Sequence, residues 1–571
     1  MVLCFLWPGR TTSYQHIHSS VPGSHSPRSP RNNVQDEQEK ARCMNPGPAP
    51  CLYNVSTTER CPTPSCVTPS LRARAAATTH SMAPPISADV VVEAAPAPAS
   101  MAVLNQMVCA SAPAPIITVV SKQLVLPEGA APVGDLNLSV SDMPMLSCHY
   151  IQKGLFFPPA GMPNARLVSS LALSLSRALG VFPALAGRLV TLPDDRIVIR
   201  CDDGAAVEFY HAVAPALSLA DFLVRDADVP TRLTKDLFPM DRTVSYEGHR
   251  RPLTSFQVTV LGDGAVFVGL VANHAVVDGT SFWHFFNTWA GLCRGEPVQP
   301  PDFSRNFFGG STAVLRFSGR DGPAVTFDAS APLRERVIHF SAASIRGLKA
   351  AANRCRKTNE DDEVNGKLVH DLKVQGGCGE ISSFQSMCAH MWRAVTRARL
   401  QLAADATTTF RMAVNCRHRL RPKISPVYFG NAIQSVATTA TVAELASHDL
   451  GWAAARLHAT VVAHEDGAIR KAAADWEAAP RCFPLGNPDG AALTMGSSPR
   501  FPMYDGNDFG WGRALAVRSG RANKFDGKMS AFPGQAGDGS VDVEVCLAPD
   551  TMGRLLCDDE FLQFVSHAPS P

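Results

Sequence analysis

A histidine and an aspartate, His274 and Asp278, stand four residues apart where the sequence changes character. Before them, residues 266–272 form an almost uninterrupted apolar run with three valines, which is typical of a strand buried on both faces. Because the unperturbed pKa of histidine lies close to working pH, His274 is a candidate general base. The carboxylate of Asp278 either orients the imidazole or turns away and fixes the loop through an arginine.

Beyond this pair the sequence predicts a helix with one aromatic face. Gly279 allows a sharp turn, and Thr280 or Ser281 could provide the N-cap. The chain contains 17 His, so an H-x-x-x-D match arises about once by chance and is a weak signal alone. A purely structural histidine is therefore the competing interpretation. The helix is indicated by aromatic residues at helical spacing: Phe282, Phe285, Phe286 and Trp289.

Length and composition exclude several classes of protein. A chain of 571 residues can hold two to four domains, and a net charge of +2 gives no reason to expect nucleic acid or an acidic membrane as partner. The 16 Cys lack paired spacing, so we expect no metal site and no disulfide framework. No apolar run approaches the roughly 20 residues that span a bilayer.

Residues 1–112 differ in composition from the rest of the chain. Ser, Thr, Pro and Ala dominate, and periodic apolar runs are missing, so we expect a disordered extension. It could be a plastid transit peptide, against which its acidic residues argue, or an extension ahead of a start near Met101 or Met107. The opening residues resemble neither a signal peptide nor an anchor. The expected location is cytoplasmic, with the plastid as the alternative.

The remaining sequence predicts an α/β protein in two halves. The N-terminal half covers 113–296, a crossover loop covers 297–336, and the C-terminal half covers 337–565. A pocket between the halves is the default ligand site. The expected elements are hairpins that join 254–260 to 265–272 and 196–201 to 207–211, helices over 167–179 and 382–400, a long helical region over 443–475, and a solvated insertion over 356–380.

Several separate stretches, in order along residues 113–565, resemble the plant BAHD acyl-CoA-dependent acyltransferases. One match alone could be chance, but the combination in register is specific to the family. The matching stretches are Leu185–Arg188, the H-x-x-x-D-G element from His274 to Gly279, Ile381–Gln385 with Ala389–Arg393, Val414–Arg419 followed by Tyr428–Asn431, and the complete D-F-G-W-G of Asp508–Gly512.

The resemblance implies two chloramphenicol-acetyltransferase-like domains with mixed β-sheets and a solvent channel between them. Acyl-CoA would be the co-substrate and a small alcohol or amine the acceptor, with no permanently bound cofactor and a monomeric state. His274 would be the general base. Asp278 would point away from the substrate and pair with Arg417, or failing that with Arg419, and so maintain the geometry of the loop.

Other site residues follow from the same resemblance. Some members have a tryptophan that donates to the oxyanion where this chain has Gly496-Ser497-Ser498, so Ser497 or Ser498 is the candidate oxyanion donor. Asn273 replaces a second histidine that some members carry. The structural candidates are Asp508, Gly510, Trp511 and Gly512, and the candidate contacts to the CoA phosphates are Arg518, Arg521 and Lys524.

Two rival functions remain open on this sequence. A repurposed member of the family could act as a lyase or as a CoA-independent transferase, which an assay of CoA dependence would reveal. A non-catalytic binding protein on the same fold would show no affinity for CoA. A serine hydrolase is disfavoured because the sequence lacks a G-x-S-x-G elbow. The identities of the acyl donor and acceptor, and O- versus N-acylation, do not follow from the sequence.

Overall fold

The computed structural model describes most of the chain from residue 116 onward. The described residues belong to one compact unit. The expected disordered extension over 1–112, and most of the expected insertion over 356–380, lie outside the described residues. The described ranges are 116–129, 133–202, 205–224, 226–309, 313–317, 322–358 and 379–566.

A mixed six-stranded sheet organises the N-terminal half. Strands β6 and β7 run parallel, and the other neighbouring pairs are antiparallel. The β7–β8 hairpin confirms the one expected over 254–272, and β8 is buried along its whole length. The strand order is β1 (Thr118–Val125), β6 (Val207–Ala214), β7 (Thr254–Leu261), β8 (Val266–Ala272), β3 (Ile151–Phe157) and β13 (Ala516–Ser519).

A second mixed six-stranded sheet lies in the C-terminal half. Strand β12 runs parallel to both of its neighbours, β10 and β14. Long-range parallel pairs of this kind give the mixed sheets that the sequence led us to expect. The order is β11 (Ile433–Thr441), β10 (Thr407–Asn415), β12 (Ala492–Met495), β14 (Lys528–Pro533), β15 (Val541–Leu547) and β9 (Arg334–Phe340).

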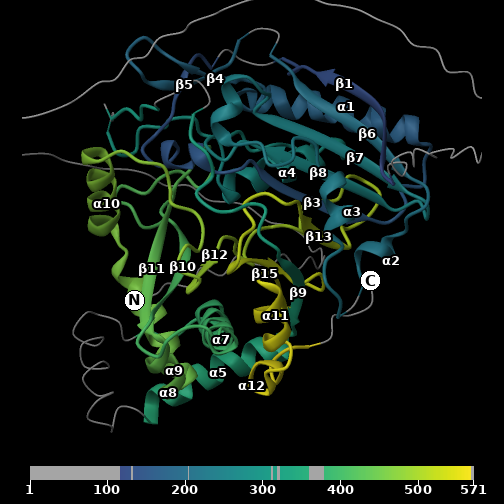
Figure 1. Ribbon diagram of the computed structural model, residues 1–571. Helices are drawn as coiled ribbons and strands as arrows, with labels where there is room; N and C mark the ends of the chain where they lie inside the picture. The colour runs from purple at the N-terminus through teal and green to yellow at the C-terminus, as the bar shows by residue number, and fades with distance from the viewer. Residues whose placement is uncertain are drawn as a thin grey trace, which may run out of the picture. The chain divides into compact units, whose positions relative to one another are not determined.

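Strand β13 corrects the expected domain boundary. It follows the D-F-G-W-G stretch in sequence, yet it pairs antiparallel with β3 and completes the N-terminal sheet, as Figure 1 shows. Residues 337–565 therefore do not form a self-contained half. The C-terminal part of the chain contributes a strand to the sheet that carries His274.

The expected hairpin of 196–201 with 207–211 is wrong. Strand β5 joins a separate three-stranded sheet, and β6 pairs with β1 and β7 instead. The buried residues of β6 are Val207, Phe209, Ala212 and Ala214. The small sheet has the order β2 (Leu136–Asn137), β5 (Ile197–Arg200) and β4 (Arg188–Thr191).

Helices complete the two cores. Helices α1 and α4 pack against each other in the N-terminal half, and α5, α7 and α9 contact one another in the C-terminal half (Figure 1). The helices are α1 (Asn164–Val181), α2 (Leu219–Phe222), α3 (Thr231–Thr234), α4 (Gly279–Cys293), α5 (Ala342–Thr358), α7 (Ser383–Ala398), α8 (Val442–Ser447), α9 (Leu450–Ala463), α10 (Asp466–Ala478), α11 (Pro549–Leu555) and α12 (Asp559–Leu562). Short 3₁₀ helices cover Met143–Ser147, Pro183–Leu185, Lys235–Leu237 and Ser245–His249.

The long helical region expected over 443–475 is confirmed, and it consists of three helices, α8, α9 and α10. The first, α8, ends at Ser447, and the carboxylate of Asp449 accepts a hydrogen bond from the Trp452 amide at 2.9 Å to cap α9. An aspartate N-cap inside a long apolar pattern starts a new helix, because its side chain replaces the missing intrahelical partner. The helix expected over 382–400 is confirmed as α7, which begins with a Ser382–Gln385 capping box.

Candidate active site

The backbone of His274 is fixed on both sides. This residue follows β8, and its amide donates to Ser245 Oγ at 3.1 Å. Its carbonyl accepts a hydrogen bond from Asn431 Nδ2 at 2.8 Å. The preceding Asn273 donates to the Ser245 carbonyl at 2.7 Å and accepts from the Ala275 amide at 2.9 Å. Asn273 therefore supports the turn at the position where some family members carry a second histidine.

The imidazole of His274 is half-buried, with one nitrogen withdrawn from solvent. Its Nδ1 atom is buried, so Nε2 is the nitrogen that can reach a bound molecule. Burial lowers the pKa of His274, and the carbonyls of His274 and Val277 and the carboxylate of Asp278 offset only part of this effect. Lys528 lowers the pKa further through its charge. The ring is therefore neutral, and able to accept a proton, at neutral pH.

Asp278 is the N-cap of helix α4. Its Oδ1 atom accepts a hydrogen bond from the Ser281 amide at 2.9 Å. This corrects the expectation that Thr280 or Ser281 would cap the helix. The aspartate takes the N-cap position because Gly279 is already the first helical residue.

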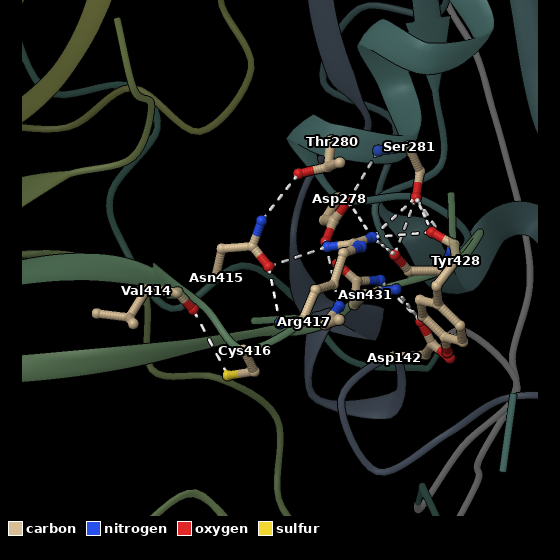
Figure 2. A network of polar contacts seen from close by, with 12 residues as sticks. Asp142, Asp278, Thr280, Ser281, Val414, Asn415, Cys416, Arg417, Tyr428 and Asn431 are labelled. Carbon is tan, nitrogen blue, oxygen red and sulfur yellow. Dashed lines mark hydrogen bonds and ion pairs between the residues drawn. The ribbon is translucent and has the colours of Figure 1, made fainter. Parts of the chain in front are cut away.

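The Asp278 carboxylate forms a two-point ion pair with Arg417 (Figure 2). Arg417 Nη1 lies 2.6 Å from Oδ2 and Nη2 lies 3.1 Å from Oδ1. Burial raises the pKa of Asp278, but the charge and hydrogen bonds of Arg417, together with the Ser281 and Ala432 amides, outweigh this and lower it below its ordinary value. Arg419, the reserve candidate, donates instead to two carbonyls at the end of α9.

Arg417 also binds the chain that follows it. Its Nη2 atom donates to the carbonyls of Tyr428 at 3.0 Å and Gly430 at 3.1 Å. Ser281 Oγ lies in the same network and donates to the Gly430 carbonyl at 3.1 Å. These contacts connect the start of α4 with the loop that leads into β11. The side chain of Asp278 is thus fully engaged by Arg417, Ser281 and Ala432.

A second buried carboxylate, Asp142, was missed by the sequence reasoning. Its Oδ1 atom accepts hydrogen bonds from the Asn431 amide at 2.8 Å and from Asn431 Nδ2 at 2.9 Å. Its Oδ2 atom accepts from Arg305 Nη1 at 3.0 Å, and Arg305 Nη2 donates to the Val276 carbonyl at 3.1 Å. Asp142 therefore fixes the asparagine that holds His274. The only sequence signal was Asn431 in the Y-F-G-N stretch, because the partners lie far apart in the chain.

The D-F-G-W-G stretch packs behind helix α4. Asp508 Oδ1 accepts hydrogen bonds from the amides of Gly510 at 2.7 Å and Gly512 at 3.0 Å, which closes a tight turn. Gly510 and Gly512 have φ angles of +103° and +121°, in the range that favours glycine. The Phe509 ring contacts Trp289 edge-on with centroids 5.0 Å apart, and Trp511 stacks on Phe509 at 5.4 Å. These contacts close a tight turn and pack two aromatic rings onto the core.

Comparison with known proteins gives the family and the fold of the chain. The sequence matches the model of the Transferase family over residues 116–562. It is 35% identical to an uncharacterized acetyltransferase of Arabidopsis thaliana over 444 residues, which cover 75% of this chain and 94% of the relative. It is 32% identical to the BAHD acyltransferase DCR of the same plant over 450 residues, or 75% and 88% of the two chains.

The chain belongs to the BAHD acyltransferase family. Another member that it resembles is the shikimate O-hydroxycinnamoyltransferase of Nicotiana tabacum, with 29% identity over 70% of this chain and 88% of the relative. Transfer of an acyl group is the activity that these relatives have in common by name.

Two solved structures confirm the chloramphenicol-acetyltransferase-like fold. Vinorine synthase superposes with a TM-score of 0.60 at 20% identity, covering 79% of this chain and 99% of that chain. TRI101 of F. sporotrichioides, solved with coenzyme A and T-2, superposes with a TM-score of 0.58 at 20% identity, covering 76% of this chain and 100% of that chain.

In this BAHD chain, the candidate oxyanion donors lie in the loop after β12. Ser498 Oγ accepts a hydrogen bond from the Arg500 amide at 3.2 Å, so one lone pair of this hydroxyl is engaged within its own loop. The ring of Phe501 packs against Gly279, next to Asp278. The loop therefore borders the start of α4, and both Ser497 and Ser498 are half-buried.

Two of the three basic residues proposed to contact CoA are bound to carboxylates. Lys524 is a correction: its ammonium is buried in an ion pair with Glu335 and also contacts Glu544 at 3.3 Å. A lysine sealed between two carboxylates has no free charge for a phosphate. Arg521 pairs with Asp241. Arg518 donates to the carbonyls of Val517 and Phe222, with its Nε atom buried.

The described part of the chain contains no group of three or more His, Cys, Asp or Glu side chains arranged to hold a metal ion. Among the helices of the same residues, none combines the length and apolar character needed to cross a membrane.

Proposed function

We propose that this BAHD acyltransferase moves an acyl group from an acyl-CoA thioester to a hydroxyl or amine, with His274 as the general base. The observation that supports the proposal is the geometry of one residue. His274 has both backbone groups fixed, a half-buried neutral ring with Nδ1 withdrawn, and a neighbouring aspartate fully occupied by Arg417. A base needs this combination of a fixed position and an open nitrogen.

The reaction has two proton transfers, both at Nε2. In the first, Nε2 accepts the proton of the acceptor O–H or N–H while the acceptor atom bonds to the thioester carbonyl carbon and the carbonyl oxygen becomes negative. In the second, the carbonyl re-forms, the C–S bond breaks, and the imidazolium returns the proton to the thiolate of CoA. The acylated product and free CoA leave. A positioned base contributes about 10²–10⁴-fold to the rate.

Asp278 supports this chemistry without carrying a proton. Its two oxygens accept hydrogen bonds from Arg417, Ser281 and Ala432, and its lowered pKa keeps it ionised near neutral pH. An anion in this position holds the first turn of α4, and hence the loop from His274, in one arrangement. Asp278 is therefore a positioning residue.

CoA as the donor is supported by the family rather than by a CoA contact in this chain. One relative is named a hydroxycinnamoyl-CoA-dependent N-hydroxycinnamoyltransferase from Avena sativa, and TRI101 was solved with coenzyme A bound. We include Arg518 and Arg521 as candidate phosphate contacts. Hydroxyl acceptors and amine acceptors both fit the base mechanism, since each delivers one proton to Nε2.

Substitution of the base tests the proposal. Purified wild-type protein is screened with acetyl-, p-coumaroyl- and palmitoyl-CoA against an acceptor panel that includes shikimate, and acceptor-dependent thiol release is measured. On the best pair, His274→Ala is expected to lower kcat by more than about 100-fold while the protein stays folded. His284→Ala is the matched control, because His284 lies in α4 with a lowered pKa but bonds the Gln299 carbonyl. An unchanged rate for His274→Ala rejects the proposal.

We extend the proposal to compartment and assembly. A cytoplasmic monomer is expected, unless residues 1–105 direct import into plastids. A fluorescent reporter fused behind those residues distinguishes the two compartments, and sedimentation of the purified chain measures the mass of the assembly.

A further inference from the structure

An arginine of the crossover segment reaches the turn that carries the proposed base. We call residues 273–277 the base turn. Arg305 lies in the stretch between α4 and β9, and its side chain is 4% exposed. Its Nη2 atom donates to the Val276 carbonyl at 3.1 Å, two residues after His274. The segment expected from the sequence as a crossover loop therefore contacts the base turn directly.

The same guanidinium is connected to the start of the base turn through Asp142. Arg305 Nη1 donates to Asp142 Oδ2 at 3.0 Å. The other oxygen of Asp142 accepts from Asn431 Nδ2 at 2.9 Å, and this amide group also donates to the His274 carbonyl at 2.8 Å. One guanidinium thus holds two carbonyls of the base turn, that of Val276 directly and that of His274 through two side chains.

Asp142 depends on Arg305 for its charge balance. The carboxylate is fully buried, and its remaining contacts at Oδ2 are the amide and the hydroxyl of Ser139, at 2.8 and 2.6 Å. Among the residues that the structure describes, Arg305 is the one cation that forms an ion pair with it. A buried carboxylate that loses its cation is left uncompensated. Removing Arg305 is therefore expected to disturb Asp142, Asn431 and the base turn together.

The crossover segment fixes the backbone from which Arg305 extends. The Asp302 amide donates to the Val427 carbonyl at 3.0 Å, and the Asp302 carbonyl accepts from the Phe429 amide at 2.8 Å. Phe303 packs edge-on against Phe429 with ring centroids 5.5 Å apart. Arg305 itself has a φ angle of +31°, which costs free energy for a residue with a side chain. Such a conformation persists only where the surrounding contacts fix it, and here it belongs to the residue with the buried guanidinium.

From these contacts we infer that Arg305 is a positioning residue for acyl transfer, which keeps the base turn, and with it His274, in one place. The inference rests on the proposed function. Proton transfer requires the imidazole within hydrogen-bond reach of the acceptor, and a misplacement of about 1 Å can cost about 10²-fold in rate. Because the partners of the guanidinium are a carboxylate and a backbone carbonyl, Arg305 contributes through the position of His274 and transfers no proton itself.

The first test is the conservative variant Arg305→Lys. A lysine keeps the charge beside Asp142 but lacks the fork that donates to Asp142 and Val276 together. Its kcat on the best donor and acceptor pair is expected to fall by about 10-fold, with KM for both substrates changed by less than about threefold. Arg305→Met also removes the charge, and its kcat is expected to fall by about 10²-fold. A graded loss confined to kcat supports the positioning role.

Arg399 provides a matched control. Its Nη2 atom pairs with Asp526 at 2.8 Å, its Nη1 atom donates to the Ala492 carbonyl at 3.0 Å, and its side chain is buried. It therefore repeats the ion pair and the carbonyl contact of Arg305, with neither partner in the base turn. Arg399→Lys is expected to lower the melting temperature as much as Arg305→Lys does, while kcat per folded molecule stays at the wild-type value.

Hydrogen exchange measures the base turn without using activity. The amides of Val276 and Val277 donate to the Asn273 carbonyl, so their exchange reports opening of the turn. Mass spectrometry follows a peptide that covers residues 273–277. In Arg305→Lys the exchange is expected to be about 2- to 10-fold faster than in wild type, the size expected from the loss of one hydrogen bond. Arg399→Lys is expected to leave it unchanged.

The outcomes separate this inference from the proposed function. Wild-type kcat and wild-type exchange in Arg305→Lys, with His274→Ala inactive, overturn the role of Arg305 and leave the base in place. Equal losses of kcat in Arg305→Lys and Arg399→Lys overturn it as well, because general destabilisation then explains both. So does a rise in KM with kcat unchanged, since Arg305 would then act on substrate binding. Activity that survives His274→Ala instead rejects the proposed function itself.

Discussion

Asp278 and Arg417, 139 residues apart in sequence, form a buried two-point ion pair with donor–acceptor distances of 2.6 and 3.1 Å. The aspartate caps the helix that follows the proposed base, and the arginine lies two residues beyond the end of β10. The pair therefore joins a loop of the N-terminal half to the chain that leaves β10 of the C-terminal sheet. The planar guanidinium of Arg417 explains why an arginine occupies this position, since a lysine cannot donate in parallel to both carboxylate oxygens.

Breaking this pair should cost both stability and activity. Asp278→Asn leaves the Arg417 guanidinium buried without a counter-ion, and such changes cost about 3–5 kcal/mol in the free energy of unfolding. Arg417→Lys keeps the charge but loses the second hydrogen bond, so its loss is expected to be smaller. Urea unfolding at pH 7 measures both. Equal stability of wild type and Asp278→Asn would show that the pair does not contribute.

The contribution of Asp278 should also disappear in acid. Its folded-state pKa is lowered, so the stabilisation is complete above the unfolded-state pKa of about 3.9 and is lost as pH falls through the folded-state pKa. The stability difference between wild type and Asp278→Asn is therefore constant from about pH 7 to pH 5 and shrinks below about pH 4. Unfolding curves at these pH values check the window. A difference that shrinks already near pH 6 contradicts it.

The pH profile of the enzyme should reflect the lowered pKa of His274. The base must be neutral to accept a proton, and burial keeps it neutral below pH 6.5, the ordinary pKa of histidine. The acid limb of kcat/KM is therefore expected below pH 6.5. The negative charge of Asp278 raises the pKa of His274, so Asp278→Asn should move the limb further toward acid in whatever activity it retains. A wild-type limb at or above 6.5 would contradict the assignment.

The sequence predicted the local elements of the fold and missed the contacts between residues that lie far apart in the chain. The β8 strand, the turn at His274 and the aromatic helix α4 follow from local patterns, because burial on two faces and helical spacing are visible in a short run. The place of β13 in the N-terminal sheet is not visible in a local pattern. A four-residue strand can join either sheet, and only tertiary packing decides which one. Arg417 was found through the family's motif. Asp142 belongs to no motif, and only its hydrogen bonds with Asn431 reveal it.

The network around Asn431 yields a prediction about positioning. Asn431 Nδ2 donates both to Asp142 and to the carbonyl of His274, so Asn431→Ala frees the backbone at the base. A small displacement of a reacting group can cost about 10²-fold, and we expect kcat to fall by about 10- to 100-fold. Stability should fall by about 1–3 kcal/mol, because Asp142 loses a partner.

A control with a comparable loss of hydrogen bonds isolates the effect on the base. Asn353 makes three hydrogen bonds to Lys349 and Ile381 and takes no part in the network around His274. Asn353→Ala should therefore lose stability to a similar degree while the folded enzyme keeps its kcat. If both variants lose kcat equally, the loss in Asn431→Ala arises from general destabilisation rather than from movement of His274.

The D-F-G-W-G stretch should act through stability alone. Phe509 is 2% exposed and packs on Phe157, Phe286 and Trp289, so Phe509→Ala removes a core ring and is expected to cost about 3–5 kcal/mol. Asp508→Ala loses the acceptor of two glycine amides, whereas Asp508→Asn keeps an oxygen there and should be nearly neutral. At a temperature where each variant is folded, activity per folded molecule should equal that of wild type. A fall in kcat for a fully folded Asp508→Asn would instead show that the carboxylate charge itself takes part in the reaction.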